Sequence, residues 1–451
     1  MEPPKIFATV AELTKQAGSA TAAAMVLGYH EPDDGGGGLF YWDTHSTETA
    51  DSGLMLAPSG AQQSGRWRRF LDGTSVSIRW FGARGDWDGR RGTDDSAAFQ
   101  AALSHVAKRG GQIHVPAGAY LLNRLVQYEG ADLMLSVVGE GVGVSQLVVA
   151  EANRDGAISL RFRDRASQIT ISDLSFVSYA AGAGTALAIT QPGGGNRHNR
   201  TAYLENVEVR GADPSAHYFV NGIDLTGCWR PLLSAVAVGG PFAPELLQPK
   251  PTANSNLFAM KIGINLDQCY EPDIRDTYVW SCRVGMTSIN DTGRLPEAFN
   301  IRSSRIVNVM TGIEFRRAGY APTFWMRDCH VNFAETGVNL RGCRLILISG
   351  TAFYNTDVDG SRVTPADINL RECRETIIES NFFHFDGNAE RTNIAIGSGA
   401  EQTMIIQNNI FNALAKTAIR FADREIQVKP TTSINGNLMS GRIQRQIVYG
   451  E

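Results

Sequence analysis

A short pattern of apolar and polar positions recurs from Ile171 into the C-terminal part of the chain. It consists of an aliphatic residue, any residue, a small or polar residue, two residues of any kind and then an apolar residue. Its ten occurrences are ISDLSF at Ile171, LENVEV at Leu204, LSAVAV at Leu233, IRDTYV at Ile274, IRSSRI at Ile301, MRDCHV at Met326, ISGTAF at Ile348, IESNFF at Ile378, IQNNIF at Ile406 and INGNLM at Ile434.

Successive occurrences start 22 to 41 residues apart, and each one predicts a short strand that ends in a corner. Such a strand cannot bury an apolar face alone, but strands stacked about 4.8 Å apart would enclose a continuous apolar interior. Leucine-rich repeats have a similar period, yet their L-x-x-L-x-L frame is absent. The pattern therefore predicts an all-β fold, a right-handed parallel β-helix of about ten or more coils.

Four of the six cysteines follow the same register, because each lies five residues before a start of the pattern: Cys228, Cys269, Cys343 and Cys373. We expect them to form a ladder of small buried thiols on one edge of the solenoid. No C-x-x-C pair occurs, so zinc-ribbon and thioredoxin-type sites have no support. We predict no metal site and no cofactor.

The segment DWDGRRGTDDSAAFQAALSHVAK precedes the repeats. It predicts a helix from about Asp94 to Lys108, with Thr93 as N-cap and acids at its positive end. A Gly-Gly turn and the strand QIHVP follow, so this helix can cover the open first turn of the solenoid. The clustered acids could bind Ca²⁺, but roles in turns and capping are favoured.

Nearer the N-terminus, VLGYHEPDDGGGGLFYWD contains four consecutive glycines. A phosphate-binding loop would end in Gly-Lys-Ser/Thr and enter a helix, whereas here two acids precede the glycines and an aromatic run follows. We expect a tight turn or bulge between two strands, because glycine adopts backbone angles that other residues avoid.

Composition limits the class of protein. The chain has 451 residues, of which 43% are hydrophobic and 20% charged, as in ordinary folded proteins. A formal net charge of -4 argues against nucleic acid as a partner. No apolar run approaches the roughly 20 residues that span a bilayer, so no membrane partner is expected. The N-terminus MEPPKIFATVAELTKQ lacks the features of a secretory signal. The sequence leaves the location open between association with a virion and release to the exterior.

Two segments match a known superfamily. FGARGD, GTDDSAAFQAAL and GGQIHVPAGAYLL together resemble the opening of the pectate-lyase-like β-helix superfamily, which includes phage tailspikes and polysaccharide depolymerases. The glycine-rich stretch, followed by GRWRRFLDG, resembles the small module often found ahead of that opening. The resemblance covers roughly residues 5 to 125 and implies a homotrimer that cleaves a bacterial surface polysaccharide or exopolysaccharide. The Asp-Pro-His-Glu run of alginate epimerases is absent, which disfavours epimerisation.

We expect four parts in this chain. They are an N-terminal cap or neck module at 1–75, the opening of the β-helix with its capping helix at 76–125, a parallel β-helix catalytic domain at 126–440 and a C-terminal tail at 441–451.

Register locates candidate chemistry, because residues at the same position of successive coils line up on one face. The positions six to nine residues after each start combine amides, aromatics and charged groups, as a sugar-binding groove does. The candidate substrate-binding residues are Trp280, Arg283, Asn308, Asn332, Tyr354, Asn355, His384 and Asn412.

Glu335 and Asp357 share the ninth position on neighbouring coils. Their carboxyls would lie roughly 5 Å apart, which suits a retaining glycoside hydrolase, and Asp386 would lie roughly 10 Å from Glu335, near the upper limit for an inverting pair. We therefore predict Glu335 and Asp357 as the acid and its partner carboxylate, with Asp386 in reserve. A lyase would instead use His384, Tyr354 or Arg283 as base or charge neutraliser.

A second-choice cluster comprises Glu271, Asp273 and Asp276 around Arg275. Asp276 shares its register with Asp173 and Asp328, so capping or local charge pairing is favoured there. The longest interval between repeats holds a Pro-rich excursion, from which Glu245 could join a site between subunits.

The leading hypothesis is a polysaccharide hydrolase that uses paired carboxylates. The alternatives are a lyase acting on a uronate, an intramolecular fructotransferase-like enzyme, and a non-catalytic glycan-binding fibre or adhesin.

Overall fold

The computed structural model of the chain describes residues 3–20, 22–60, 64–131, 133–151, 153–193, 200–247, 250–290, 298–356, 358, 366–385, 391–397, 403–413, 415–422, 431–440 and 443–450. Its internal contacts divide the chain into two compact units, Met1–Phe176 (unit 1) and Val177–Glu451 (unit 2). No helix within these described ranges is long and apolar enough to cross a membrane.

Unit 1 begins with a mixed five-stranded sheet in the order β1-β2-β3-β5-β4, in which only β1 and β2 are parallel. Its elements are β1 (Lys5–Thr9), α1 (Val10–Leu13), β2 (Ala23–Gly28), β3 (Gly38–Asp43), β4 (Met55–Leu56) and β5 (Arg66–Arg69). Alternate residues of β2 and β3 are buried, and Phe40, Trp42 and Trp67 dominate a core closed by Val10 and Leu13. The predicted strand-rich N-terminal module is confirmed.

The glycine run connects β2 to antiparallel β3, as predicted. Gly35 has a φ of 78°, and a Cβ on Gly37 would lie 2.5 Å from the carbonyl oxygen of Val26. The Arg69 guanidinium donates to the carbonyl oxygens of Gly36 and Gly37 at 2.7 and 2.5 Å. These glycines therefore serve the turn itself.

The remaining elements of unit 1 form the first coils of the β-helix. They are β6 (Ser75–Ser77), η1 (Ile78–Phe81), α2 (Ser96–Val106), β7 (Gly111–His114), β8 (Gly118–Leu121), β9 (Val126–Gly130), β10 (Met134–Val138), β11 (Ser145–Val149), β12 (Gly156–Phe162) and β13 (Gln168–Ser178), which reaches into unit 2. Parallel pairs β7–β10, β8–β11 and β9–β12 stack the second coil on the first.

Helix α2 packs against β7 and β9, with Phe99 and Leu103 buried, so the predicted capping helix is present. The prediction of Thr93 as its N-cap is wrong. Asp95 precedes the helix, and its carboxylate accepts the backbone N–H groups of Arg84 and Gly85 at 2.7 and 3.1 Å. Thr93 donates its hydroxyl to Asp86 at 2.9 Å. The acids of this segment hold turns, as favoured over Ca²⁺ binding.

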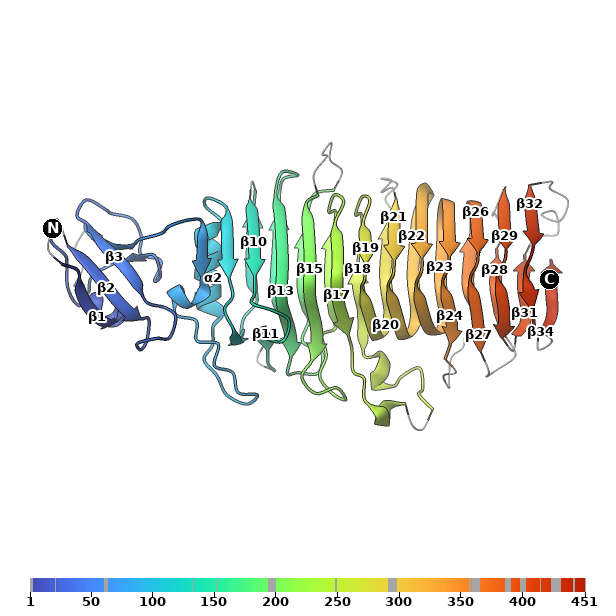
Figure 1. The fold of residues 1–451 in the computed structure, drawn as a ribbon, viewed down its shortest axis with the longest axis horizontal. Coiled ribbons are helices and arrows are strands. Elements are labelled where there is room, and N and C mark those ends of the chain that lie inside the picture. Colours follow the sequence, from blue (N-terminus) through green and yellow to red (C-terminus); the bar gives the residue numbers. More distant parts are fainter. Residues whose placement is uncertain are drawn as a thin grey trace. The chain divides into compact units, whose positions relative to one another are not determined.

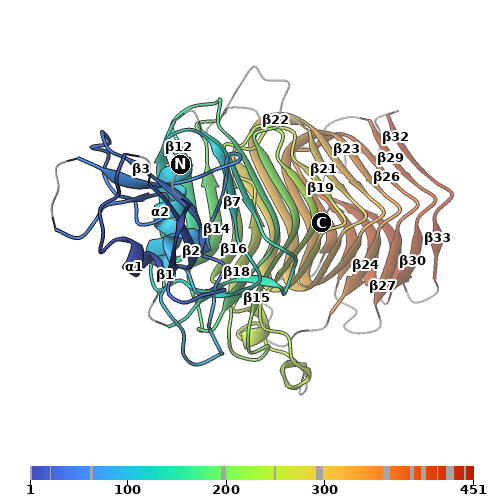
Figure 2. The same cartoon turned by 60° about the vertical axis from the view of Figure 1, so that its left-hand side comes forward.

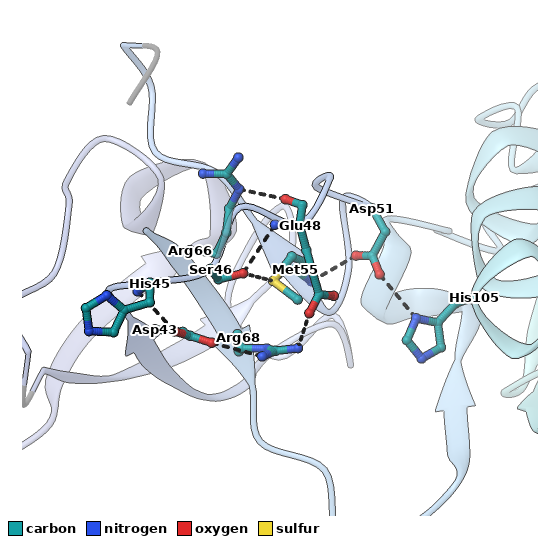
Figure 3. A network of polar contacts seen from close by, with 9 residues as sticks. All are labelled: Asp43, His45, Ser46, Glu48, Asp51, Met55, Arg66, Arg68 and His105. Atoms are coloured by element: carbon teal, nitrogen blue, oxygen red, sulfur yellow. Dashed lines mark hydrogen bonds and ion pairs between the residues drawn. The ribbon is translucent and has the colours of Figure 1, made fainter. Parts of the chain in front are cut away.

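A polar network holds the loop between β3 and β4 (Figure 3). Arg68 bridges Asp43 and Glu48 at 2.9 and 2.8 Å. The Asp51 carboxylate accepts three backbone N–H groups of its own loop and lies 3.2 Å from Nδ1 of His105 on α2. The network joins the five-stranded sheet to the capping helix within unit 1.

Unit 2 contains the remaining coils, stacked strand beside strand from green to red in Figure 1. The elements are β14 (Thr185–Thr190), β15 (Ala202–Gly211), β16 (Asn221–Thr226), β17 (Leu232–Gly239), η2 (Pro244–Leu246), η3 (Asn256–Phe258), β18 (Met260–Asn265), β19 (Asp273–Arg275), β20 (Tyr278–Asn290), β21 (Phe299–Arg302), β22 (Arg305–Arg327), β23 (His330–Ser349), β24 (Ala352–Asn355), β25 (Ala366–Arg371), β26 (Arg374–Glu379), β27 (Phe382–Phe385), β28 (Thr392–Ile396), β29 (Met404–Gln407), β30 (Ile410–Ala413), β31 (Ala415–Phe421), β32 (Thr432–Asn435), β33 (Leu438–Met439) and β34 (Ile443–Tyr449).

The third residue of every repeat is a left-handed corner. All ten have φ between 50° and 61°: Asp173, Asn206, Ala235, Asp276, Ser303, Asp328, Gly350, Ser380, Asn408 and Gly436. Gly, Asn and Asp tolerate this conformation better than other residues, which explains the small or polar third position. The first residue of each of the first nine repeats is buried, and the predicted parallel β-helix is confirmed.

Buried cysteines and a stack of asparagines lie inside unit 2. All four ladder cysteines are free and buried, as predicted, and so are Cys282 and Cys329. Burial raises the pKa of Cys329 to about 11. Asparagines stack inside the last coils, where Nδ2 of Asn381 donates to Asn409 at 3.1 Å and Nδ2 of Asn409 donates to Asn437 at 3.0 Å.

Asp367 and Arg391 form an ion pair whose side chains are both fully buried. Asn393 donates to the same Asp367 carboxylate at 2.5 Å. Nothing in the sequence pattern predicted these charges inside the solenoid.

The structure corrects the prediction of a C-terminal tail at 441–451, because Ile443–Tyr449 forms strand β34. This strand pairs in parallel with β31 and continues the β-helix. At the end of this strand the ring of Tyr449 stacks on the ring of Phe421 of β31, with the ring centroids 5.0 Å apart.

Candidate functional site

The predicted groove column lies on the outer side of one set of strands in unit 2. In Figure 2 the strands β24, β27, β30 and β33 run side by side along this side. Parallel pairing places these residues next to one another on successive coils: Gly239 and Trp280, Trp280 and Val307, Asn332 and Tyr354, Tyr354 and His384, His384 and Asn412. The structure thus brings most of the candidates together in the expected order.

Aromatic rings dominate this outer side, and we call Tyr278, Trp280, Tyr354, Phe382 and His384 the aromatic face. The rings of Tyr278 and Trp280 are stacked with centroids 5.0 Å apart, and those of Tyr354 and His384 with centroids 5.4 Å apart. Tyr278, Tyr354 and Phe382 are between 38% and 43% exposed. These rings offer apolar surface to a ligand that carries few charges.

The conformation of Trp280 depends on the coil before it. A Cβ on Gly239 would lie only 1.8 Å from the indole ring, so the ring lies directly over the backbone of that glycine. Any larger residue would push the indole away from the sheet. The glycine therefore sets the orientation of one half of the aromatic face.

Two candidates have structural roles instead. Asn355 is 2% exposed, and its Nδ2 donates to the carbonyl oxygens of Phe333 and Ala334 at 3.1 and 2.9 Å. Asn308 is a bulge residue with a φ of 54°, because two residues of β22 face one residue of β23 at this point. The structure therefore corrects the assignment of Asn355 to substrate binding, because this side chain is buried and bonded to the backbone.

The Pro-rich excursion packs against the β-helix of its own chain. Leu257 and Phe258 of η3 form a buried cluster with Met310, Ala334 and Val358. Arg283 supports the excursion by donating to the carbonyl oxygen of Ala253 at 3.1 Å. The excursion thus packs against the β-helix beside Ala334, and Glu245 is exposed in its first short helix.

Glu335 follows Ala334 on β23, next to the residue on which the excursion packs, and is half-buried. The predicted partners Asp357 and Asp386 lie outside the described residues. Within the described ranges, no group of three or more His, Cys, Asp and Glu side chains is arranged to hold a metal ion.

On the same side, His330 of β23 lies opposite Arg305 of β22. Burial, together with the nearby positive charge of Arg305, lowers the pKa of His330 below its usual value.

The second-choice cluster forms local charge pairs. Glu271 lies 3.0 Å from Arg230, and Asp273 lies 3.2 Å from Arg200 and 3.6 Å from Arg302. Asp276 is one of the left-handed corners. The charge pairs favoured from sequence are present, but with other arginines than Arg275, whose Nε donates to Oγ of Ser234 at 3.1 Å.

Two comparisons of sequence each match a part of the chain. Residues 6–72 match the family described as phage tail protein small four-stranded beta-sheet domain. A stretch of 101 residues is 35% identical to "Depolymerase 1, capsule K3-specific" of Klebsiella phage KP32 and covers 20% of this chain and 11% of that protein. The five-stranded sheet at the start of unit 1 thus lies within the segment that matches this family model, and the parallel β-helix follows it in the chain.

Solved structures share the fold over most of the chain. The A-modules of the mannuronan C-5 epimerases AlgE4 and AlgE6 of Azotobacter vinelandii each align with a TM-score of 0.52, at 17% and 13% identity. They cover 82% and 83% of this chain and 96% and 97% of theirs. Full-length tailspike protein 2 of Escherichia coli O157:H7 bacteriophage CAB120 aligns at 13% identity with a TM-score of 0.48, and the chain spans 55% of its length. At such identities the likeness concerns the fold alone.

Proposed function

We propose that this chain is a depolymerase that hydrolyses glycosidic bonds of a bacterial capsule or exopolysaccharide. The observation that carries the proposal is the aromatic face, because stacked, partly exposed rings beside amides and a half-buried glutamate are what a glycan chain requires for binding. The 35% identity to a capsule depolymerase over 101 residues supports the same substrate class.

In this mechanism Glu335 is one of the two carboxyl groups and Asp357 its partner, with Asp386 in reserve. One carboxyl protonates the glycosidic oxygen while the other acts as nucleophile or as general base, and each cleavage consumes one water. Asn332, Tyr354, His384 and Asn412 would orient the sugars along the aromatic face.

The mass of released products tests the proposal. The protein is incubated with a panel of acidic and neutral capsular polysaccharides, and the oligosaccharides are weighed by mass spectrometry. Hydrolysis adds one water per cleavage. Products without added water that absorb in the ultraviolet would assign a lyase instead, with His384 or Tyr354 as base.

Products without added water or ultraviolet absorbance would assign an intramolecular transferase. Binding without any release would assign a glycan-binding fibre. Both outcomes contradict hydrolysis, and a lyase product contradicts it as well.

We also propose that the chain assembles as a homotrimer, which the superfamily resemblance supports. Light scattering coupled to size-exclusion chromatography measures the mass directly. A mass near 48.9 kDa would identify a monomer and contradict the trimer.

A further inference from the structure

A second outer surface of unit 2 lies on a different set of strands, β23, β25, β28 and β31. It contains a hollow of about 400 Å³, which is within the usual range of roughly 300–1,000 Å³ for ligand sites. We call this hollow the arginine pocket, because Arg341, Arg371 and Arg420 line it.

The hollow exists because two neighbouring outward positions of one coil are occupied by small residues, Ala395 and Gly397. Asn369 is paired with Ala395, and Ala395 with Arg420, so a methyl group lies between two longer side chains. Next to it, a Cβ on Gly397 would lie 3.1 Å from Cγ of Arg371. The aliphatic part of Arg371 therefore lies over a glycine, and the floor of the pocket is left low.

The lining is cationic. It contains three arginines and one glutamate, a formal charge of +3 − 1 = +2, in a chain whose formal net charge is -4. The one acid, Glu372, is occupied, because Nε and Nη2 of Arg341 donate to its two oxygens at 3.2 and 3.0 Å. Arg371 and Arg420 are exposed, and neither forms an ion pair or a side-chain hydrogen bond with another described residue.

One polar group of the lining favours a sugar. Nδ2 of Asn369 donates to Oδ1 of Asn339 at 2.9 Å, which fixes the orientation of the amide. Oδ1 of Asn369 accepts no hydrogen bond from the described part of the chain. It can therefore accept a hydrogen bond from a sugar hydroxyl, while a pair of guanidinium groups binds a carboxylate.

We infer that the arginine pocket binds a carboxylate-bearing sugar residue of the polysaccharide, at a site separate from the aromatic face. Arg371 and Arg420 bind the carboxylate, and Asn369 accepts a hydrogen bond from a sugar hydroxyl. The inference rests on the proposed function in taking a polysaccharide as ligand, and it adds that this polysaccharide is acidic.

Binding of oligogalacturonate and of neutral maltohexaose, measured by calorimetry at low salt, tests the inference. We expect the acidic probe to bind the native chain, and the double variant Arg371→Gln/Arg420→Gln to weaken it at least tenfold. The variant Arg161→Gln/Arg163→Gln removes the same charge from the C-terminal end of β12 and the residue that follows it in unit 1, and should leave binding unchanged. A second variant, Ala395→Leu, fills the hollow without changing its charge and should weaken binding to a similar extent.

Thermal unfolding of each variant shows that it is folded. Equal weakening by both arginine pairs would mean attraction by overall charge and overturn the inference, as would no binding of the acidic probe. Inorganic phosphate that displaces the probe at equal concentration would also overturn it in favour of a phosphate site. Release of oligosaccharides from the capsule panel is scored separately, so the pocket and the proposed hydrolysis can fail independently.

Discussion

One part of the aromatic face, Tyr354, Phe382 and His384, lies on the same coils as the arginine pocket, and the two surfaces present different residues outward. Inside, both sets of strands present apolar columns. Phe353, Phe383 and Phe411 stack beneath the aromatic face at 5.2 and 4.7 Å, while Ile368, Ile394 and Ile419 are buried beneath the pocket. Outside, one surface offers rings and amides, and the other offers guanidinium groups around a small floor.

The difference shows where the fold constrains the sequence. An inward residue must fill a close-packed interior that its neighbours on adjacent coils also fill. An outward residue has only to be compatible with a strand. The two outer surfaces are therefore free to carry function, and we expect them to divide it: cleavage beside the aromatic face, and retention of an acidic chain in the arginine pocket.

The largest expected effect is on turnover. Glu335→Gln should lower kcat by about 10²–10⁴-fold, because an amide cannot serve as acid, base or nucleophile, while glycan binding persists. Steady-state kinetics on the cleaved capsule measures this, with the exposed Glu205→Gln as matched control. Full activity of the Glu335 variant would show that Glu335 is not a catalytic carboxyl group and would contradict cleavage beside the aromatic face.

The next effect is on stability and separates interior from exterior. Asn409→Ala deletes the acceptor of Asn381 and the donor to the carbonyl oxygen of Ile378. It should lower the free energy of unfolding by about 3 kcal/mol, because buried groups lose their partners.

Denaturant unfolding compares this variant with Tyr354→Ala and Arg371→Gln, each expected to cost less than about 1 kcal/mol as an exposed substitution. Equal losses for all three would contradict the view that the outer columns are free of folding constraints.

A smaller effect separates the two surfaces by ligand. Trp280→Ala should weaken binding of the cleaved glycan about tenfold, or about 1.4 kcal/mol, because a stacking surface is lost. Trp325 is exposed and lies on β22, away from the aromatic face and beside Arg327. Trp325→Ala is therefore the matched control, and equal weakening by both would show that binding is not confined to the aromatic face.

The smallest effect is a salt dependence. Raising NaCl from 50 to 500 mM should weaken oligogalacturonate binding a few-fold, because salt shortens the distance over which the exposed arginines attract a carboxylate. Binding of a neutral oligosaccharide to the aromatic face should change far less. The same titration calorimetry measures both affinities. An identical dependence on NaCl concentration would contradict the division into a charged and an uncharged binding surface.

Much of the fold follows from one repeated pattern. The strands, the inward cysteines and the parallel stacking were predictable, because burial enforces the same residue type at the same position of each coil. The register also ordered Trp280, Tyr354 and His384 correctly. It failed for Asn355, because whether an amide turns outward or bonds its own backbone depends on the local chain path.

The arginine pocket was missed although a signal exists. NLRGCR at Asn339 and NLRECR at Asn369 are nearly identical segments on adjacent coils, and they place Arg341 beside Arg371. The hollow beside them was not predictable, because it needs Ala395 and Gly397 from the following coil. The buried pair of Asp367 and Arg391 was missed because charged residues are normally exposed.

The sequence by itself determined that this chain winds into stacked parallel strands behind a small sheet, since apolar periodicity and corner residues act locally. Only the tertiary structure decided that β34 extends the solenoid, that the Pro-rich excursion packs against Met310 and Ala334, and that two outer surfaces of different charge share some of the same coils. Those outcomes depend on contacts between residues far apart in the chain, whose free energy no local pattern records.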